Sequence, residues 1–408
     1  MRSLGMSPFC AALVLLVQSL LFIACTPASL TGKVQRKDLF SVGYGMSENQ
    51  VDLSSQGRDG MDLTMSQGIF HMLDGRSRKV MRFSSYGDLL ALLYDPLISP
   101  VPRIVQPLAT PGADTTEDKG QALAGRYAVP LTFTQPRKMA VGKDQTMYVA
   151  DRGTASSDWV VRRFGAMGIE KAYLGQEGPG GSPFPAVLSM DVLGDDTLGV
   201  VSATESGYLV HHFGKEGNLL SSLRIGRDAL PLPQELADTG GGRPDGGRTE
   251  AGGTASRIHT NLDGMILTSE GESFGVILKL DYYREFYDSA SLVIARNEFS
   301  GSWIIAMDGW TGRILYNTRI AAGGQESPAP ELIGLNSGLY YMLYASTSSD
   351  EPRIIQLMDD KGKIHRRVRI SAPEGAREMI TIRVSAEGQV YALFKMDEEV
   401  QVSLWNFR

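Results

Sequence analysis

Three stretches of this chain share one phrase with identical spacing: VMRFSSYG at Val80–Gly87, VRRFGAMG at Val161–Gly168 and VHHFGKEG at Val210–Gly217. Each phrase ends in a glycine, and an apolar run follows it. Because glycine adopts positive φ without steric cost, the phrase predicts a strand, a tight turn and a returning strand. A looser fourth copy is IQLMDDKG at Ile355–Gly362. Copies with the same spacing indicate a repeat architecture.

A second recurring feature is a short turn pair followed by a run of β-branched and aromatic residues, which is typical of a hairpin. The pairs are Gln67-Gly68, Asp144-Gln145, Asp195-Asp196, Asp263-Gly264, Ser337-Gly338 and Glu387-Gly388. Helical periodicity is weak beyond the N-terminal segment. Six strand-rich units joined by turns predict an all-β fold, a six-bladed β-propeller. We expect the ring to close by pairing of Leu39–Tyr44 with the C-terminal VQVSLWNFR, since closure removes exposed sheet edges.

The domain boundaries follow from composition. The propeller is expected over residues 38–408, with inserted loops near 96–129, 236–256 and 321–330. The second insertion contains GGGRPDGGRTEAGG, which has no apolar surface to bury. It is therefore predicted to be a mobile loop between the third and fourth units, cut first by trypsin at Arg243 or Arg248.

The N-terminus has the layout of a secretory signal peptide. No charged residue lies between Arg2 and Lys33, and an apolar run ends in small residues at Ala24-Cys25. The stretch LFIAC resembles a bacterial lipobox, which implies cleavage after residue 24 and acylation of Cys25. Residues 1–24 are then the signal peptide and 25–37 the lipidated cysteine and a polar tether. An uncleaved membrane anchor and plain secretion are the alternatives.

The chain also resembles a known repeat family. TFTQPRKMAVGKDQTMYVADRG at Thr132–Gly153, followed by VVRRFGAMG, is similar to an NHL repeat, and the Gly-rich stretch Leu174–Pro185 is similar to the link between NHL blades. With the lipobox, the whole resembles uncharacterised spirochaete envelope lipoproteins. The resemblance implies a six-bladed NHL-type propeller at the cell envelope. It does not fix the function, because NHL propellers serve as lyases, sensors and binding modules.

Polar residues on the innermost strands are the candidates for a ligand site, because these strands line the central channel. The candidates are Lys138, Asp191, Arg257, His259 and Arg383. Such a cationic cluster suits a small anionic ligand, and a hydrated channel wall is the structural alternative. His211 and His212 are adjacent in a strand, so they point to opposite faces and do not chelate one metal. Asp74 and Asp151 close strands and are expected to cap turns.

The fourth unit carries an aromatic cluster that is the candidate partner surface. Its residues are Tyr282, Tyr283, Arg284, Phe286 and Tyr287. Exposed Tyr and Arg are enriched at protein contacts. The alternative is that these aromatic side chains pack between the sheets inside the blade.

Three functions remain open. The main hypothesis is a membrane-anchored envelope lipoprotein whose propeller is a binding or scaffold module for a protein or small ligand. The alternatives are a lactonase- or lyase-like propeller enzyme with a divalent metal in its channel, and a periplasmic ligand sensor. No enzymatic activity and no cofactor are predicted, and the expected partners are the bilayer and envelope proteins. The formal charge of −6 argues against nucleic acid.

Overall fold

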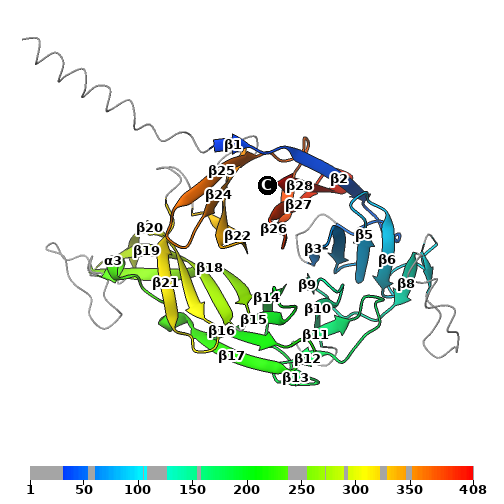
Figure 1. The fold of residues 1–408 in the computed structure, drawn as a ribbon, viewed down its shortest axis with the longest axis horizontal. Helices are drawn as coiled ribbons and strands as arrows, with labels where there is room; N and C mark the ends of the chain where they lie inside the picture. The colour runs from blue at the N-terminus through cyan, green and yellow to red at the C-terminus, as the bar shows by residue number, and fades with distance from the viewer. Residues whose placement is uncertain are drawn as a thin grey trace, which may run out of the picture.

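The computed structural model describes residues 31–53, 60–103, 105–107, 126–153, 158–237, 255–271, 273–288, 293–321, 329–345 and 352–407. Across these residues the chain forms six β-sheets arranged as blades of a closed ring (Figure 1). The predicted six-bladed propeller is therefore confirmed. We number the blades 1 to 6 in the order of their innermost strands.

Blades 1 to 3 come first along the chain. Blade 1 contains β3 (Met61–Ser66), β4 (Ile69–Asp74), β5 (Lys79–Phe83) and β6 (Leu89–Tyr94), extended by β8 (Tyr127–Pro130) and β7 (Gln106–Pro107). Blade 2 contains β9 (Lys138–Val141), β10 (Met147–Arg152), β11 (Trp159–Phe164), β12 (Leu174–Gly175) and β13 (Gly178–Pro179). Blade 3 contains β14 (Val187–Val192), β15 (Leu198–Thr204), β16 (Gly207–Phe213) and β17 (Leu219–Gly226).

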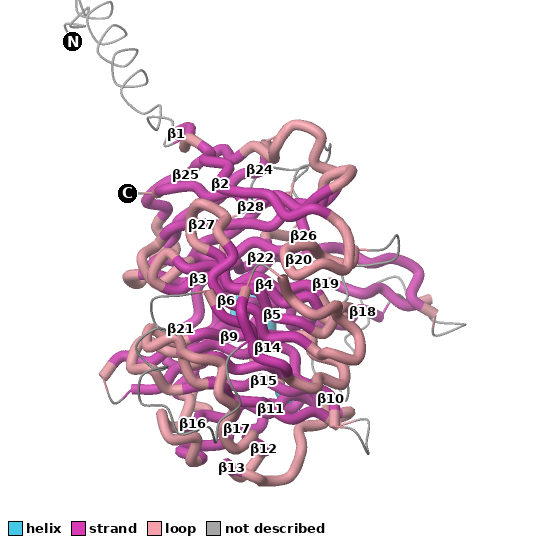
Figure 2. The backbone as a smooth tube through the Cα atoms, turned by 90° about the vertical axis from the view of Figure 1, so that its right-hand side faces the viewer, coloured by secondary structure: helices cyan, strands magenta, loops and turns pink. Residues whose placement is uncertain are grey.

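Two short helical turns, η1 (Arg227–Ala229) and α3 (Gln234–Ala237), follow blade 3. Blade 4 contains β18 (Ala255–Glu270), β19 (Ser273–Tyr287), β20 (Ile294–Asp308) and β21 (Ile314–Arg319). Its first three strands are far longer than β21, which pairs only with residues 303–307 of β20. We call the excess, residues 255–262, 281–287 and 294–302, the arm. Figure 2 shows these long strands projecting from one side of the ring.

Blades 5 and 6 complete the ring. Blade 5 contains β22 (Glu331–Asn336), β23 (Leu339–Tyr344), β24 (Arg353–Met358), β25 (Ile364–Ile370) and the N-terminal β1 (Thr31–Lys33). Blade 6 contains β26 (Glu378–Val384), β27 (Gln389–Lys395), β28 (Glu399–Asn406) and the N-terminal β2 (Arg36–Gly43). The antiparallel pairing of β2 with β28 places Val42 opposite Val400, which is the closure that the sequence predicts.

The turn phrases fold as expected. Their glycines all have positive φ, at Gly87 (87°), Gly168 (73°), Gly217 (88°) and Gly362 (80°). One turn pair behaves differently: Asp263-Gly264 is no hairpin turn but lies inside β18, where the register with β19 shifts. The turn of this blade is instead at Gly271, whose φ is 59°. Because β18 continues through the expected turn to Glu270, residues 264–270 form its part of the blade. Residues 255–262 then extend beyond the blade as the arm.

The chain around the blades also differs from the expected boundaries. Residues 31–33 and 36–37, expected as a tether, belong to β1 and β2, where they gain backbone partners on β25 and β28. The expected loop near 96–129 contains β7 and β8, which extend blade 1. The signal peptide, Cys25, Arg243 and Arg248 lie outside the described residues. No described helix is long and apolar enough to cross a membrane.

Apolar side chains fill the spaces between neighbouring blades. At the closure, Phe40 of β2 packs with Phe70 and Phe83 of blade 1 and belongs to one buried cluster with Val400 and Val402 of β28. Burying each such side chain contributes about 1.5–3 kcal/mol. The N-terminal strand is therefore held by its partner strand and by the core of the next blade.

Candidate functional site

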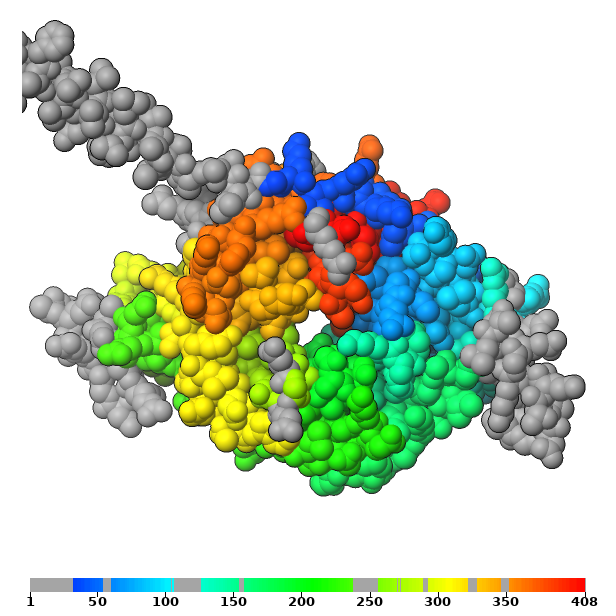
Figure 3. All heavy atoms as spheres, viewed as in Figure 1, coloured from blue at the N-terminus to red at the C-terminus, as the bar shows by residue number. Residues whose placement is uncertain are grey.

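The six innermost strands surround a central channel that stays open when all atoms are drawn (Figure 3). These strands are β3, β9, β14, β18, β22 and β26. Their contacts run around the ring, with β3 lying beside both β9 and β26, and β22 beside both β18 and β26. Polar side chains on these strands are therefore the ones that meet a molecule in the channel.

An ion pair joins the first and last blades at the channel. Nη2 of Arg383, on β26, lies 2.8 Å from Oδ1 and 3.1 Å from Oδ2 of Asp62, on β3. The Asp62 carboxylate also accepts hydrogen bonds from the backbone N–H of Leu63 (3.0 Å) and of Met139 on β9 (2.9 Å). One carboxylate therefore links blades 1, 2 and 6.

Several neighbouring groups affect the pKa of Arg383. Burial opposes the guanidinium charge, but Asp62, Tyr391 and Asp191 outweigh burial and raise the pKa of Arg383 above its ordinary value. Only Nη2 bonds to Asp62, so the Nε and Nη1 donors of Arg383 have no partner among the described residues. The guanidinium is thus held through Nη2, while Nε–H and Nη1–H remain as donors for a molecule in the channel.

Asp191 is the second carboxylate of this cluster. It stands immediately before the last residue of β14, as Arg383 does on β26, so the two residues occupy equivalent positions in blades 3 and 6. Part of the Asp191 surface is exposed to solvent, but the residue is surrounded by many protein atoms. Burial raises its pKa, Asp62 adds to this, and Arg383 partly offsets it. A carboxyl group with a raised pKa suits general acid–base chemistry near neutral pH.

The other predicted channel residues do not join this cluster through any contact that the structure gives. Lys138 lies on β9 and is half-buried. Arg257 and His259 lie on the arm part of β18, each with a side-chain nitrogen 3.9 Å from a Glu285 carboxylate oxygen. They are on an innermost strand, but the length of β18 carries them beyond the blade.

The residues of the candidate partner surface differ in their exposure to solvent. Tyr282 is fully buried, stacks edge-on against Trp303 and donates its hydroxyl to the Pro231 carbonyl at 2.6 Å. It is therefore not available to a partner, because this part of β19 faces the blade core. Tyr283, Arg284, Phe286 and Tyr287 are half-buried on the arm. Phe286 lies under the Arg296 guanidinium, 4.2 Å from it.

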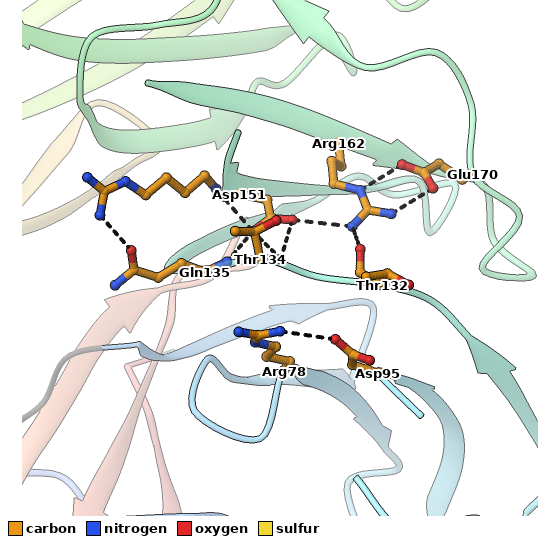
Figure 4. A network of polar contacts seen from close by, with 9 residues as sticks. Arg78, Asp95, Thr132, Thr134, Gln135, Asp151, Arg162 and Glu170 are labelled. Atoms are coloured by element: carbon orange, nitrogen blue, oxygen red, sulfur yellow. Dashed lines mark hydrogen bonds and ion pairs between the residues drawn. The ribbon is translucent and has the colours of Figure 1, made fainter. Parts of the chain in front are cut away.

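Asp151 shows what the strand-ending aspartates do (Figure 4). Its carboxylate accepts the backbone N–H of Gln135 at 2.7 Å and of Thr134 at 3.1 Å, and it lies 3.3 Å from Nη1 of Arg162. Arg162 in turn makes a two-pronged contact with Glu170, with both distances 2.7 Å. Asp74 caps its turn in the same way, through the N–H groups of Arg76 and Ser77. These aspartates are structural.

The described residues offer no metal centre. They contain no group of three or more His, Cys, Asp or Glu side chains that could hold an ion. His211 and His212 point to opposite faces of β16, as predicted: His211 lies against Phe184, and His212 stacks on Phe274.

Asp62 was not among the site residues predicted from the sequence. It stands on the innermost strand before the first turn pair, so its position marked it as a channel residue, but its partner lies at the other end of the chain.

No protein-family model and no curated protein matches the chain. Solved structures share its fold at low identity. They include the β-propeller domain of the Trilobed protease from Pyrococcus furiosus (7% identity, covering 86% of this chain and 94% of that chain, TM-score 0.42). A gluconolactonase from Xanthomonas campestris (11%, 91% and 99%, 0.39) and a second propeller of gluconolactonase type (10%, 94% and 95%, 0.39) are also similar.

The six sheets of the structure establish the propeller fold, and the similar structures bear on one prediction. The prediction of no enzymatic activity is contradicted as an exclusion: the similar structures include a gluconolactonase and a putative gluconolactonase. A fold does not determine a function, so activity has to be argued from the residues of the site.

Proposed function

We propose that the protein is a propeller hydrolase that cleaves a small ester or lactone in its central channel, with Asp191 as the general base. The observation that carries this proposal is the placement of Asp191: a carboxyl group with a pKa raised by burial, in the channel, near the partly unengaged guanidinium of Arg383. Positioned acid–base groups of this kind accelerate reactions by about 10²–10⁴-fold.

The reaction balances with water as the only co-reactant. The Asp191 carboxylate takes a proton from water while the water oxygen bonds to the carbonyl carbon. The free N–H groups of Arg383 stabilise the negative charge on the carbonyl oxygen. When the C–O bond to the leaving alkoxide breaks, protonated Asp191 returns the proton to that oxygen. Asp62 acts as a positioning residue, because it fixes the Arg383 guanidinium from one edge.

A divalent metal, part of the enzyme hypothesis from sequence, does not fit this site as described. Both oxygens of Asp62 are already engaged by Arg383 and backbone N–H groups. Among the described residues, no group of three or more His, Cys, Asp or Glu side chains could hold an ion there.

We further propose that the enzyme is an NHL-type lipoprotein of the cell envelope, anchored through acylated Cys25. The lipobox-like stretch supports this, and Cys25 is the only cysteine that remains after cleavage. Acyl chains bind a bilayer with about 0.8 kcal/mol per buried methylene. A palmitate analogue should label the wild-type protein and leave the Cys25→Ser variant unlabelled. Equal labelling of both would contradict the anchor.

A second candidate function, a binding module for an envelope protein, is favoured by the arm. Residues 294–299 of β20 are all exposed, including Ile294 and Phe299, each 47% exposed. Crosslinking in native envelopes should capture a partner with the wild-type protein and lose it with Phe299→Ser. The exposed Tyr86, changed to Ser, is the control. Retained capture by Phe299→Ser would remove this candidate.

Hydrolysis of a panel of lactones and small esters tests the proposed reaction. The wild-type protein should hydrolyse at least one member, and Asp191→Asn should reduce its kcat/KM by about 100-fold or more. Asp228→Asn, the same change at an exposed residue of η1, is the matched control and should keep full activity. A wild type without hydrolysis, or an Asp191→Asn variant with unchanged kcat/KM, would contradict the proposal.

A further inference from the structure

A small cavity lies between blades 1 and 2, away from the channel cluster. It has room for a single water-sized group. Its polar lining residues are His71, Arg82, Tyr127 and Gln145. One of these four side chains is always charged.

The charged side chain is Arg82, and all of its described partners are neutral. Nη1 donates to the Tyr127 hydroxyl at 2.8 Å and to the Ala166 carbonyl at 2.7 Å, and Nη2 donates to Oε1 of Gln145 at 3.2 Å. No described carboxylate forms an ion pair with it. A half-buried guanidinium without a counter-charge is costly, since burial of charge requires pairing.

Donors around this cavity also lack partners. Nε of Arg82 and Nε2 of Gln145 are buried donors that have no hydrogen-bond partner among the described residues, and Nδ1 of His71 is a buried ring nitrogen that also has none. The His71 side chain is only 1% exposed. Burial, helped by the charge of Arg82, lowers the pKa of His71 to about 3, so its ring is neutral. The cavity therefore has one cation, several hydrogen-bond donors and no described anion.

The next interface, between blades 2 and 3, supplies an internal comparison. In the repeated phrase Arg163 is equivalent to Arg82, and its Nη1 donates to the Lys215 carbonyl just as that of Arg82 donates to Ala166. Nη2 of Arg163 lies 3.9 Å from the Glu216 carboxylate. The charges of Arg163, Glu216 and Asp196 all act on the pKa of one buried group, Tyr148, which burial raises. One of these acids, Glu216, therefore lies near this second arginine, while Nζ of Lys215 lies 3.6 Å from the carboxylate of the other, Asp196.

Both acids are missing at the first interface. Met167 stands where the phrase has Glu216, and Gln145 stands where the turn has Asp196. Gln145 and Asp196 share the same backbone conformation, with φ of 63° and 62°. The chain thus repeats the arginine but neither of these two acidic residues.

We propose that the cavity between blades 1 and 2 binds one small monovalent anion of halide size. The anion receives hydrogen bonds from Nε of Arg82 and Nε2 of Gln145, with His71 closing the site, and supplies the missing counter-charge. A halide suits the cavity because it carries a full charge in about the space of one water molecule. A water molecule would satisfy donors but leave the Arg82 charge uncompensated.

Bromide tests this proposal on the full-length protein in detergent. The thermal unfolding midpoint is measured while bromide replaces methanesulfonate at constant ionic strength. Ligand binding to the folded state should raise the wild-type midpoint by about 1–3 °C. Gln145→Asp installs the acid that the neighbouring interface has, at a φ that aspartate tolerates, and should abolish the bromide response. Gln234→Asp, the same change at an exposed residue of α3, should respond like the wild type.

Crystals soaked in bromide should show one anomalous peak within hydrogen-bond distance of Arg82 in the wild-type protein. A wild-type midpoint that does not depend on bromide would overturn the proposal and indicate a water-filled cavity. An equal response in Gln145→Asp would overturn it as well, since the effect would then arise elsewhere. Neither readout depends on hydrolysis in the channel.

Discussion

Asp62 and Arg383 are 321 positions apart in the sequence, yet their side chains meet between the neighbouring innermost strands β3 and β26, with a nitrogen–oxygen distance of 2.8 Å. The pair joins blade 1 to blade 6, beside the seam where β2 and β28 close the ring. The Asp62 side chain is only 4% exposed, so this ion pair is largely shielded from solvent on its carboxylate side. The ion pair and the pairing of β2 with β28 both hold the first and last parts of the chain together. The ion pair does so on the innermost strands, and the strand pairing does so on the outer strands of blade 6.

Removing the guanidinium should weaken the folded state. Arg383→Met leaves a buried carboxylate without its cation, so the free energy of unfolding should fall by about 3 kcal/mol. The control is Arg377→Met, which breaks an ion pair of blade 6 whose two side chains are 68% and 66% exposed. Urea unfolding should show a lower midpoint for Arg383→Met and an unchanged one for Arg377→Met. Equal midpoints in the two variants would show that the channel pair does not hold the ring.

The closure strand makes a second prediction. Trp405 of β28 is fully buried, whereas Trp310 is 46% exposed. Trp405→Ala should lower the free energy of unfolding by about 3–5 kcal/mol, and Trp310→Ala by clearly less. Deleting residues 400–408 should abolish the cooperative thermal transition, because β2 then loses its partner. Calorimetry checks both, and an unchanged transition in the truncated protein would contradict closure by β28.

Stability should also fall on mild acidification. Burial lowers the pKa of His211 to about 4, so the folded protein keeps this ring neutral while the unfolded chain protonates it near pH 6.5. Between these values the unfolded state binds more protons, and stability decreases as the pH falls. The contribution reaches roughly 3 kcal/mol at pH 4.

His211→Phe isolates this effect, because it removes the titration and keeps an aromatic ring beside Phe184 and Phe213. Urea unfolding at pH 7.5 and at pH 4.5 gives the measurement. The wild type should lose more stability than the variant over this range, and parallel losses would mean that His211 titrates normally.

Much of the ring was predictable because its signals are local. The repeated phrase specifies a strand, a turn and a strand within eight residues, and the glycines that it requires take positive φ. The arm was not predictable in this way. Asp263-Gly264 has the composition of a turn, but pairing with β19 carries β18 straight through it with a bulge, which the local sequence does not encode.

The same distinction between local signals and long-range contacts applies to the candidate site. Asp191 and Arg383 were predictable from their position before the end of an innermost strand. Their connection to Asp62 was not, because it depends on how the ends of the chain meet. Arg257 and His259 share the innermost strand of blade 4, but the length of β18 places them on the arm with Glu285.

The dependence of the hydrolysis rate on pH tests the catalytic role of Asp191 most directly. Burial raises the pKa of this carboxyl group, so kcat/KM should rise with pH through an apparent pKa above about 3.9, the ordinary value for aspartate. The rising limb should be present in the wild type and in Asp228→Asn and absent from any residual activity of Asp191→Asn. A wild-type profile without this limb, or the same limb in Asp191→Asn, would contradict the account.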